Sequence, residues 1–246
     1  MARSIPPASV VASGGAPPVI VVTGMAFEAR IARGKGVEVV YAARADLLER
    51  ALSAALAHGC SGILSFGTAG GLAPELEPGA LIVADAVQGP FGRIETNRNW
   101  TDRLSAACSG GALRTRFRRG VTAAVSAPLV TAEDKQVLHR TTGALAVDME
   151  SHIAGAAAAA RGLPFAVCRT IVDPAWRTLP PAATAGLRDD GTTALGPILR
   201  ELLRQPSQIG ALIELAGDAR AAKRSLVLAR QAMDAGGTLI VDAIAP

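Results

Sequence analysis

Ile63-Leu64-Ser65-Phe66-Gly67-Thr68-Ala69-Gly70-Gly71 is the stretch of sequence on which the fold assignment rests. Its first four residues are mostly apolar, which predicts a short buried strand over residues 63–66. The glycine-rich remainder predicts a tight turn over Gly67–Gly71, where a ligand can approach the backbone closely. The stretch therefore predicts a strand whose carboxyl end opens onto a loop suited to binding, as in open α/β sheets.

Strands and helices alternate on both sides of this stretch. The predicted strands are short β-branched or apolar runs, and the predicted helices carry apolar residues at helical spacing. We expect strands over residues 19–23, 37–41, 63–66, 81–87, 121–125, 145–147 and 165–172. We expect helices over residues 46–58, 101–107, 133–140, 149–161, 196–204 and 207–235, with Asp46 as a helix cap. The alternation predicts a layered α/β fold with a largely parallel sheet.

Length and composition fit one domain with a large core. The chain has 246 residues, of which 50% are hydrophobic and only 3% aromatic. Met1–Pro18 is rich in proline and glycine and predicts a flexible tail. Residues 19–246 predict a single domain, with a C-terminal helical extension over 207–235. No apolar run reaches the roughly 18 residues that span a bilayer, so we expect a soluble or peripheral protein.

Charge and cysteine usage narrow the possible partners. The net charge is +4, and part of the excess is the cluster Arg114, Arg116, Arg118 and Arg119. A solvated surface is the plain interpretation of this cluster, and attraction to anionic lipid is the alternative. Nucleic-acid binding is disfavoured because no aromatic residues interleave with the arginines. The three cysteines are widely spaced, which predicts neither a metal site nor a disulfide and fits a cytoplasmic location.

Four groups that could carry chemistry fall at the ends of predicted strands: Glu28, Thr68–Gly71, Glu150 and Asp173. Strand ends that meet at one edge of a sheet form the crevice in which this architecture binds ligands. The apolar neighbours of Asp173 favour its protonated form, so it is a candidate general acid. Each carboxylate also has a purely structural explanation. Aspartate before proline is a common turn residue, and glutamate in a first helical turn is favoured by the helix dipole.

Taken in order, these groups resemble motifs of the purine nucleoside phosphorylase and nucleosidase superfamily. The likeness is close to the methylthioadenosine/S-adenosylhomocysteine nucleosidase branch and extends over about residues 19–174. The matching motifs are Thr23-Gly24-Met25-Ala26-Phe27-Glu28, Gly67-Thr68-Ala69-Gly70-Gly71-Leu72, Ala146-Val147-Asp148-Met149-Glu150 and Arg169-Thr170-Ile171-Val172-Asp173. The resemblance implies a three-layer α/β fold in which helices flank a mixed central sheet.

The resemblance also implies roles for individual residues. Asp173 would protonate the departing adenine, Glu28 would activate a water, and Glu150 would hold the ribose hydroxyls. One departure is Val172, because the family usually has serine just before the catalytic aspartate. No metal or organic cofactor is expected, and the family habit implies a homodimer or a larger homo-oligomer. The other implied substrate contacts are Thr68, Ala69, Gly70, Leu129, Val130, Met149 and Arg169.

A narrower likeness links the region after Asp173 to the hopanoid-associated phosphorylases, also described as adenosylhopane nucleosidases. The matching segments are Val172-Asp173-Pro174-Ala175, Leu179-Pro180-Pro181-Ala182, Leu187-Arg188 with Gly191, and Leu203-Arg204-Gln205-Pro206. This likeness implies release of adenine from adenosylhopane, which yields ribosylhopane in hopanoid biosynthesis. Such a substrate carries a large apolar 5′ group, so we expect contact with the inner membrane surface. The basic, amphipathic C-terminal helix could supply that contact, or it could pack on the sheet.

Three other interpretations of the sequence remain open. Phosphate could replace water as the nucleophile, in which case Arg30, Arg44 and Thr68 are the candidate phosphate ligands. The small nucleosides methylthioadenosine and S-adenosylhomocysteine could be the substrates. A nucleoside-binding protein without activity is disfavoured, because binding alone requires neither an acid nor a base.

Overall fold

The computed structural model describes residues 17–181, 183, 191–192, 200–201 and 204–240. Its centre is an eight-stranded sheet in the order β2-β1-β3-β7-β6-β4-β5, and β8 pairs with β3 and β4. The strands are β1 (Val19–Thr23), β2 (Val37–Tyr41), β3 (Gly62–Gly71), β4 (Leu81–Gly89), β5 (Gly92–Glu95), β6 (Phe117–Ala124), β7 (Ala146–Asp148) and β8 (Phe165–Asp173). The helices are α1 (Ala26–Ala32), α2 (Ala45–Leu56), α3 (Arg98–Cys108), α4 (Ala132–Thr142), α5 (Ser151–Ala159) and α8 (Ile209–Ala235).

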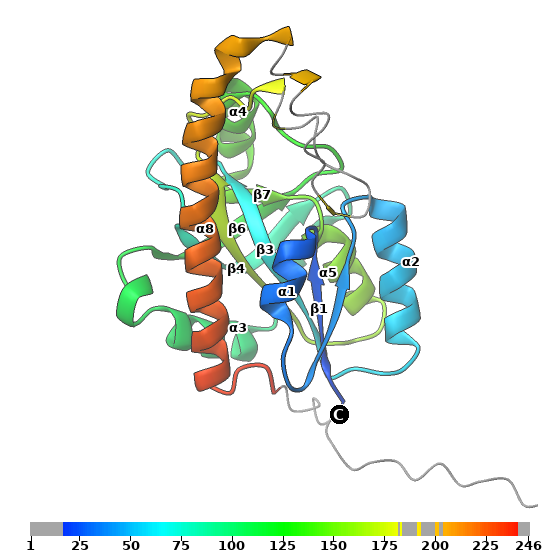
Figure 1. The fold of residues 1–246 in the computed structure, drawn as a ribbon. Helices are drawn as coiled ribbons and strands as arrows, with labels where there is room; N and C mark the ends of the chain where they lie inside the picture. The colour runs from blue at the N-terminus through cyan, green and yellow to red at the C-terminus, as the bar shows by residue number, and fades with distance from the viewer. Residues whose placement is uncertain (1–16, 182, 184–190, 193–199, 202–203, 241–246) are drawn as a thin grey trace, which may run out of the picture.

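Helices cover both faces of the sheet, so the three-layer fold with a mixed central sheet is confirmed (Figure 1). Side chains on β1 alternate between the faces, because successive residues of a strand point in opposite directions. Val19 and Val21 pack with α1, α3 and α8, whereas Ile20 and Val22 pack with α2 and α5. The sheet is mixed because β3–β7, β4–β5 and β4–β8 are antiparallel, while the other pairings are parallel.

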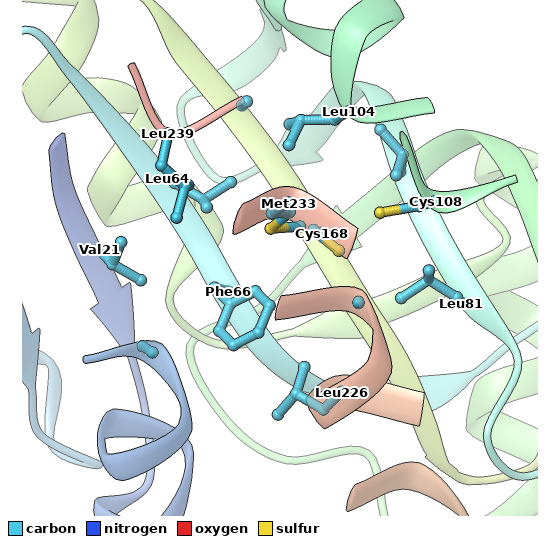
Figure 2. Close-up of a cluster of buried hydrophobic side chains, with 14 of the residues drawn as sticks. Val21, Leu64, Phe66, Leu81, Leu104, Cys108, Cys168, Leu226, Met233 and Leu239 are labelled. Carbon is cyan, nitrogen blue, oxygen red and sulfur yellow. The ribbon is translucent and has the colours of Figure 1, made fainter. Parts of the chain in front are cut away.

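The second half of α8 belongs to the core. Figure 2 shows Leu226 and Met233 beside Phe66 of β3 and Cys168 of β8, and all four side chains are fully buried. The first half of α8 extends past the sheet (Figure 1), and Ile213 there is 68% exposed. The apolar stripe expected on this helix therefore packs on the sheet in its second half. In the part of the chain that the structure describes, no helix is long and apolar enough to cross a membrane.

The predicted turn over Gly67–Gly71 is wrong, because β3 continues through all five residues. Each residue of this segment is paired with a neighbouring strand. Residues 67–70 align in parallel with β8, and Gly70 and Gly71 align antiparallel with Val147 and Ala146 of β7. Glycine favours turns locally, but pairing with these strands overrides that preference. The strand therefore carries the glycines into the middle of the sheet.

Three smaller predictions also need correction. The helix expected from Met149 begins at Ser151, and Glu150 is its N-cap residue. Arg44, not Asp46, precedes the first turn of α2. The short strand β5 was not predicted, because its residues are largely exposed and show no apolar alternation.

Some sequence expectations lie outside the described residues. These are most of the N-terminal tail (residues 1–16), most of the helix expected over 196–204, and the motif positions Ala182, Leu187, Arg188 and Leu203. Pro18, at the end of the expected tail, is described, and its carbonyl accepts a hydrogen bond from the Ser61 amide.

Candidate active site

Glu28 lies at the start of α1, and its carboxylate joins the β1–α1 loop to strand β3. Oε2 accepts hydrogen bonds from the amides of Gly24 (3.1 Å) and Met25 (3.0 Å). Oε1 accepts from the amide and the hydroxyl of Thr68, both at 2.7 Å. Four donors thus occupy the lone-pair positions of a side chain that is only 1% exposed. The Thr68 hydroxyl is the one mobile donor of the four, because the others are backbone amides.

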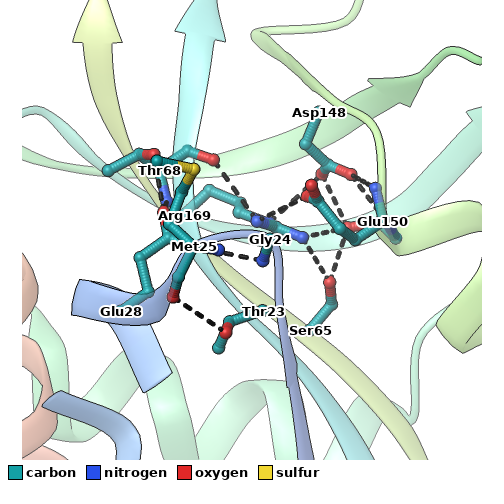
Figure 3. Close-up of polar contacts among 10 residues, drawn as sticks. Thr23, Gly24, Met25, Glu28, Ser65, Thr68, Asp148, Glu150 and Arg169 are labelled. Carbon is teal, nitrogen blue, oxygen red and sulfur yellow. Dashed lines mark hydrogen bonds and ion pairs between the residues drawn. The ribbon is translucent and has the colours of Figure 1, made fainter. Parts of the chain in front are cut away.

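Arg169 on β8 is the central charge of the site (Figure 3). Its guanidinium is fully buried and lies 3.1 Å from Glu150 Oε2 and 3.3 Å from Asp148 Oδ2. It also donates to the Thr68 carbonyl at 3.3 Å and to Ser65 Oγ at 2.5 Å. A buried guanidinium needs such partners, because an unpaired buried charge is very costly. The network therefore unites residues from β3, β7 and β8.

Asp148 fixes the start of α5. Its Oδ1 accepts from the amides of Glu150 (3.0 Å) and Ser151 (2.7 Å), and its Oδ2 accepts from the Ser151 hydroxyl at 2.6 Å. These bonds satisfy amide groups that the helix itself cannot pair. The Ser151 oxygen is also hydrogen-bonded to the Ser65 hydroxyl at 3.0 Å, as an acceptor when its own proton goes to Asp148. As a result, Glu150 leaves the backbone in a fixed direction, toward Arg169.

Two glycines make room for these carboxylates. A Cβ atom at Gly24 would overlap the carboxylate of Glu150. A Cβ atom at Gly67 would lie 2.8 Å from Glu28 Oε2 and 2.9 Å from Arg169 Nη1. Real Cβ atoms do not tolerate such distances, and the groups involved are held by other bonds. The glycines of both sequence motifs are therefore required by the packing of the charged side chains.

Asp173 ends β8 and forms a second polar centre. Its Oδ2 accepts from Lys135 Nζ of α4 at 2.5 Å, and the carboxyl group lies next to Gly70 of β3. Lys135 is fully buried and also donates to the carbonyls of Pro174 (3.1 Å) and Arg177 (3.0 Å). The ammonium group has three donors, and all three are used.

The register of β3 and β8 sets the distance between the two centres. Gly67 is aligned with Arg169, and Gly70 is aligned with Asp173 after a bulge. Three residues along a strand correspond to about 10 Å. The Arg169 network and the Asp173 carboxyl group thus start from backbone positions about 10 Å apart along β3.

Burial raises the pKa of all three carboxyl groups with a predicted role. The pKa of Glu150 rises to about 7, because it is buried near Asp148 and Glu28, although Arg169 opposes the rise. Burial also raises the pKa of Glu28 against the opposing effects of Arg169 and Thr68. For Asp173, burial raises the pKa and Lys135 opposes it. Carboxyl groups with raised pKa values are common in active sites.

The structure places Glu28, Thr68, Glu150 and Arg169 close together, and Asp173 lies beside Gly70 at the carboxyl end of the same strand pair. The remaining predicted contacts are less direct. Ala69 packs its side chain into the core, so only its backbone can face a ligand. Leu129 packs on the cluster around Leu72 and Val147.

Val130 and Met149, two other predicted contacts, have the following surroundings. The carbonyl of Val130 accepts a hydrogen bond from the Leu179 amide at 2.8 Å, which ties this segment to the loop after β8. Met149 is partly buried between β7 and α5. Both residues therefore remain predictions as substrate contacts.

The sequence analysis assigned no role in the site to four of its buried polar residues: Ser65, Lys135, Asp148 and Ser151. Ser65 had a usable signal, because a polar residue in a buried apolar strand needs a partner. Lys135 had none, since a lysine that follows two acidic residues on a helix is typical of a solvated face.

The sequence offered several arginines as phosphate ligands or as a basic patch, and the structure shows the surroundings of three of them. Arg44 pairs with Asp46 at the surface, and Arg30 is exposed. Arg119, one member of the basic cluster, is 2.5 Å from both Asp85 and Asp102. Part of the positive charge that the sequence suggested for a lipid or nucleic-acid surface is therefore neutralised within the chain.

A sequence profile of the phosphorylase superfamily matches residues 8–194, which is well over half of the chain. The chain belongs to the phosphorylase superfamily. This match includes the strands and loops that carry Glu28, Thr68, Glu150, Arg169 and Asp173. None of the curated proteins compared with the chain matches it.

Solved structures show the same superfamily fold at low sequence identity. The 5′-methylthioadenosine/S-adenosylhomocysteine nucleosidase of Helicobacter pylori is 16% identical, with 91% of this chain and 98% of that chain covered and a TM-score of 0.62. The futalosine hydrolase of Helicobacter pylori strain 26695 is 15% identical, with 90% and 97% covered and a TM-score of 0.63. The 5′-methylthioadenosine/S-adenosylhomocysteine nucleosidase of Neisseria meningitidis is 12% identical, with 89% and 99% covered and a TM-score of 0.63.

Proposed function

We propose that this phosphorylase-superfamily chain hydrolyses the N-glycosidic bond of an adenine nucleoside. The observation that carries the proposal is the pairing of β3 with β8. It places a buried acid, Asp173, three β3 residues, or about 10 Å along the strand, from the position of Arg169, around which buried carboxyl groups gather. Cleavage of this bond needs an acid at the base and negative charge near the sugar. The similar nucleosidase structures support the same reaction class, and one of them holds 5′-methylthioadenosine in its active site.

At the acid end, Asp173 would donate its proton to N7 of adenine. The C1′–N9 bond then breaks, its electron pair stays with the base, and neutral adenine departs. Burial favours the protonated form of Asp173 before the reaction. Gly70 allows the base to approach, because it places no side chain beside the carboxyl group.

At the carboxylate end, Glu150 would accept hydrogen bonds from the ribose hydroxyls and stabilise the positive charge that develops on the sugar. Arg169 and Asp148 hold Glu150 in place on either side. Because the Thr68 hydroxyl donates to Glu28, its oxygen can accept a hydrogen bond from the attacking water. The water proton would pass to the Thr68 oxygen while the Thr68 proton moves to Glu28.

The charge around Arg169 favours water over phosphate as the nucleophile. One guanidinium faces three carboxyl groups, those of Glu28, Asp148 and Glu150. Even with Glu150 half protonated, this end of the site carries negative charge, which repels a phosphate dianion. The alternative of phosphorolysis is therefore less well supported by the described residues.

The test is to incubate the protein with adenosine or 5′-methylthioadenosine, with and without phosphate, and to identify the products by mass spectrometry. We expect adenine and the free sugar at equal rates in both conditions. A sugar 1-phosphate that forms only with phosphate would show phosphorolysis instead. Failure to release adenine from any adenine nucleoside, including the lipid-linked one below, would exclude the proposed reaction.

For the natural substrate we propose adenosylhopane, with ribosylhopane as the product. The support is the sequence likeness after Asp173, together with apolar side chains that the structure leaves exposed near that segment. Trp176 is 50% exposed, and Ile209 and Ile213 on α8 are 48% and 68% exposed. Arg177 joins the loop to α8 through ion pairs with Glu214 and Asp218, so these apolar groups belong to one region.

A competition experiment tests the lipid substrate. Adenosylhopane in mixed micelles should be cleaved with a higher kcat/KM than 5′-methylthioadenosine in the same micelles. Flotation with anionic liposomes should recover the protein, and Ile213→Asp should reduce recovery without changing turnover of the small nucleoside. Preference for the small nucleoside would assign the chain to methylthioadenosine or S-adenosylhomocysteine cleavage.

We also propose that a second copy of the chain covers the groove between α2 and α5. The groove has a volume of about 210 Å³, and its lining is mostly apolar, with Glu49, Ser53 and Arg161 as the polar members. Phe91 lines it and is 63% exposed, and an exposed aromatic side chain beside an apolar groove is typical of interfaces. Sedimentation velocity should give a dimer, and Phe91→Glu should shift it toward the monomer.

A further inference from the structure

Lys135 is a fully buried lysine that the proposed reaction does not use. Its ammonium group lies 2.5 Å from Asp173 Oδ2 and bonds the carbonyls of Pro174 and Arg177. These three acceptors belong to the segment that leaves β8. Helix α4 supplies the lysine from 38 residues earlier in the chain. Burial of a charged group destabilises the fold unless its partners are well placed, so this arrangement requires accurate placement of the three acceptors.

The charges around Asp173 are few. Lys135 reaches it from α4, and Arg177 acts on it from the following loop. Arg177 is itself paired with Glu214 and Asp218 of α8, which reduces its effect on Asp173. The neighbouring strand contributes Gly70, which has no charge. Among the described residues, Lys135 is therefore the dominant charged partner of the acid.

The hydrogen bond from Lys135 makes the two oxygens of Asp173 unequal. Oδ2 accepts from an ammonium group, which favours Oδ1 as the position of a proton on the carboxyl group. The same bond prevents rotation of the carboxyl group about its last single bond. A general acid works best when its proton already points at the accepting atom.

We propose that Lys135 is a positioning residue for base protonation, which holds Asp173 through Oδ2 so that Oδ1 delivers the proton to the purine. This inference rests on the proposed function and adds a residue to it. In the reaction, the Oδ1–H bond breaks, an N7–H bond forms, and the carboxylate left behind is stabilised by the ammonium beside it. Lys135 keeps all its protons throughout.

The test compares Lys135→Met, Lys135→Gln and Lys135→Arg with the wild type and with Lys223→Met, an exposed lysine of α8 as control. Each protein is assayed with adenosine and with 4-nitrophenyl riboside, whose leaving group needs no protonation. Thermal unfolding shows whether each variant folds. Lys135→Gln is included because its amide can still donate to the carbonyls of residues 174 and 177 if the methionine variant does not fold.

We expect loss of the charge at position 135 to lower kcat for adenosine by roughly tenfold to a hundredfold. Turnover of 4-nitrophenyl riboside should stay within about threefold, and Lys135→Arg should recover most of the adenosine activity. The alkaline limb of the kcat profile with adenosine should move to higher pH, because a carboxyl group without its cation holds its proton longer.

Equal losses with both substrates, or an alkaline limb that does not move, would overturn the inference and leave Lys135 as a structural residue. Such a result leaves the proposed function intact, provided that the wild type releases adenine. If the wild type releases no adenine from any nucleoside, the proposed function fails first. The two failures are therefore distinguishable.

Discussion

Gly67 and Arg169 face each other in register across β3 and β8, and the Arg169 guanidinium fills the space that a side chain at position 67 would need. The carboxylate of Glu28 limits the same space from the other side. A single hydrogen atom at position 67 thus allows a cation and an anion to lie close together inside the protein.

Replacement of Gly67 by alanine should therefore separate these two groups. The added Cβ would lie 2.9 Å from Arg169 Nη1, so either the arginine or Glu28 must move. We expect kcat/KM for adenine release to fall at least about a hundredfold, as small displacements at reacting groups do. Gly217→Ala on the exposed face of α8 is the control and should retain activity, because nothing lies near its Cβ position. Near-normal activity of Gly67→Ala would show that the contact is unimportant.

Thr68 provides a test of the route from water to Glu28. Thr68→Val removes the hydroxyl that lies 2.7 Å from Glu28 Oε1, whereas Thr68→Ser keeps it. Loss of proton-transfer assistance should reduce kcat by roughly 10²-fold in the valine variant. The serine variant should stay within a few-fold of the wild type. Equal activity of both variants would remove Thr68 from the route.

Asp173→Asn should nearly abolish adenine release while the protein stays folded. An amide cannot supply the proton, and acid–base assistance is worth roughly 10²–10⁴ in rate. A matched change in the substrate should have the same effect. 7-Deazaadenosine, which has carbon in place of N7, should bind as an inhibitor but should not be cleaved. Turnover of this compound at a rate near that of adenosine would contradict the role of Asp173.

Gly191 should be needed to keep the Glu28 loop in place. Its carbonyl accepts from the Ala26 amide at 3.0 Å, and an added Cβ would overlap the Gly24 carbonyl. We expect Gly191→Ala to lower kcat by at least about tenfold. Gly36→Ala is the matched control, because φ is +72° at Gly36 and +76° at Gly191, but nothing lies near Gly36. The control should lose stability only, through the strained backbone that both variants share. Equal kcat losses in the two variants would refute the role of Gly191.

The pH dependence of stability should report the buried carboxyl groups. The pKa of Glu150 is raised from 4.5 to about 7 in the folded protein, so the folded state holds this proton more tightly than the unfolded state. The free energy of unfolding should then fall as pH rises from about 4.5 to about 7, because over this range the unfolded state has already released the proton that the folded state still holds. Calorimetry of the ligand-free protein should show a Tm lower by several degrees at pH 7.5 than at pH 5. Glu150→Gln should reduce this slope, and an unchanged slope would refute the assignment.

The fold could be predicted from the sequence because its signals are local. Apolar runs such as Val19–Thr23 and Phe165–Val172 are strands wherever they pack, and the structure confirms them. The continuation of β3 through Gly67–Gly71 could not be predicted. It depends on hydrogen bonds from β7 and β8, which are remote in the sequence.

The residues of the candidate site show the same difference between local signals and contacts that are remote in the sequence. Glu28 and Asp173 could be proposed because both follow predicted strands and match family motifs. Lys135 could not, since its burial depends on a carboxyl group 38 residues away and its neighbours Glu133 and Asp134 are those of an exposed helix. Only the folded structure shows which charged residues lie next to one another.

Helix α8 has a further, mechanical consequence. It is a single rod of 27 residues, about 40 Å long, with one end set in the core and the other outside it. Glu214 and Asp218 pair the outer half with Arg177. The carbonyl of Arg177 accepts a hydrogen bond from Lys135, which also pairs with Asp173. A pull or tilt applied at Ile209 would act, through the contacts of Arg177 and Lys135, on Asp173, the acid of the proposed reaction.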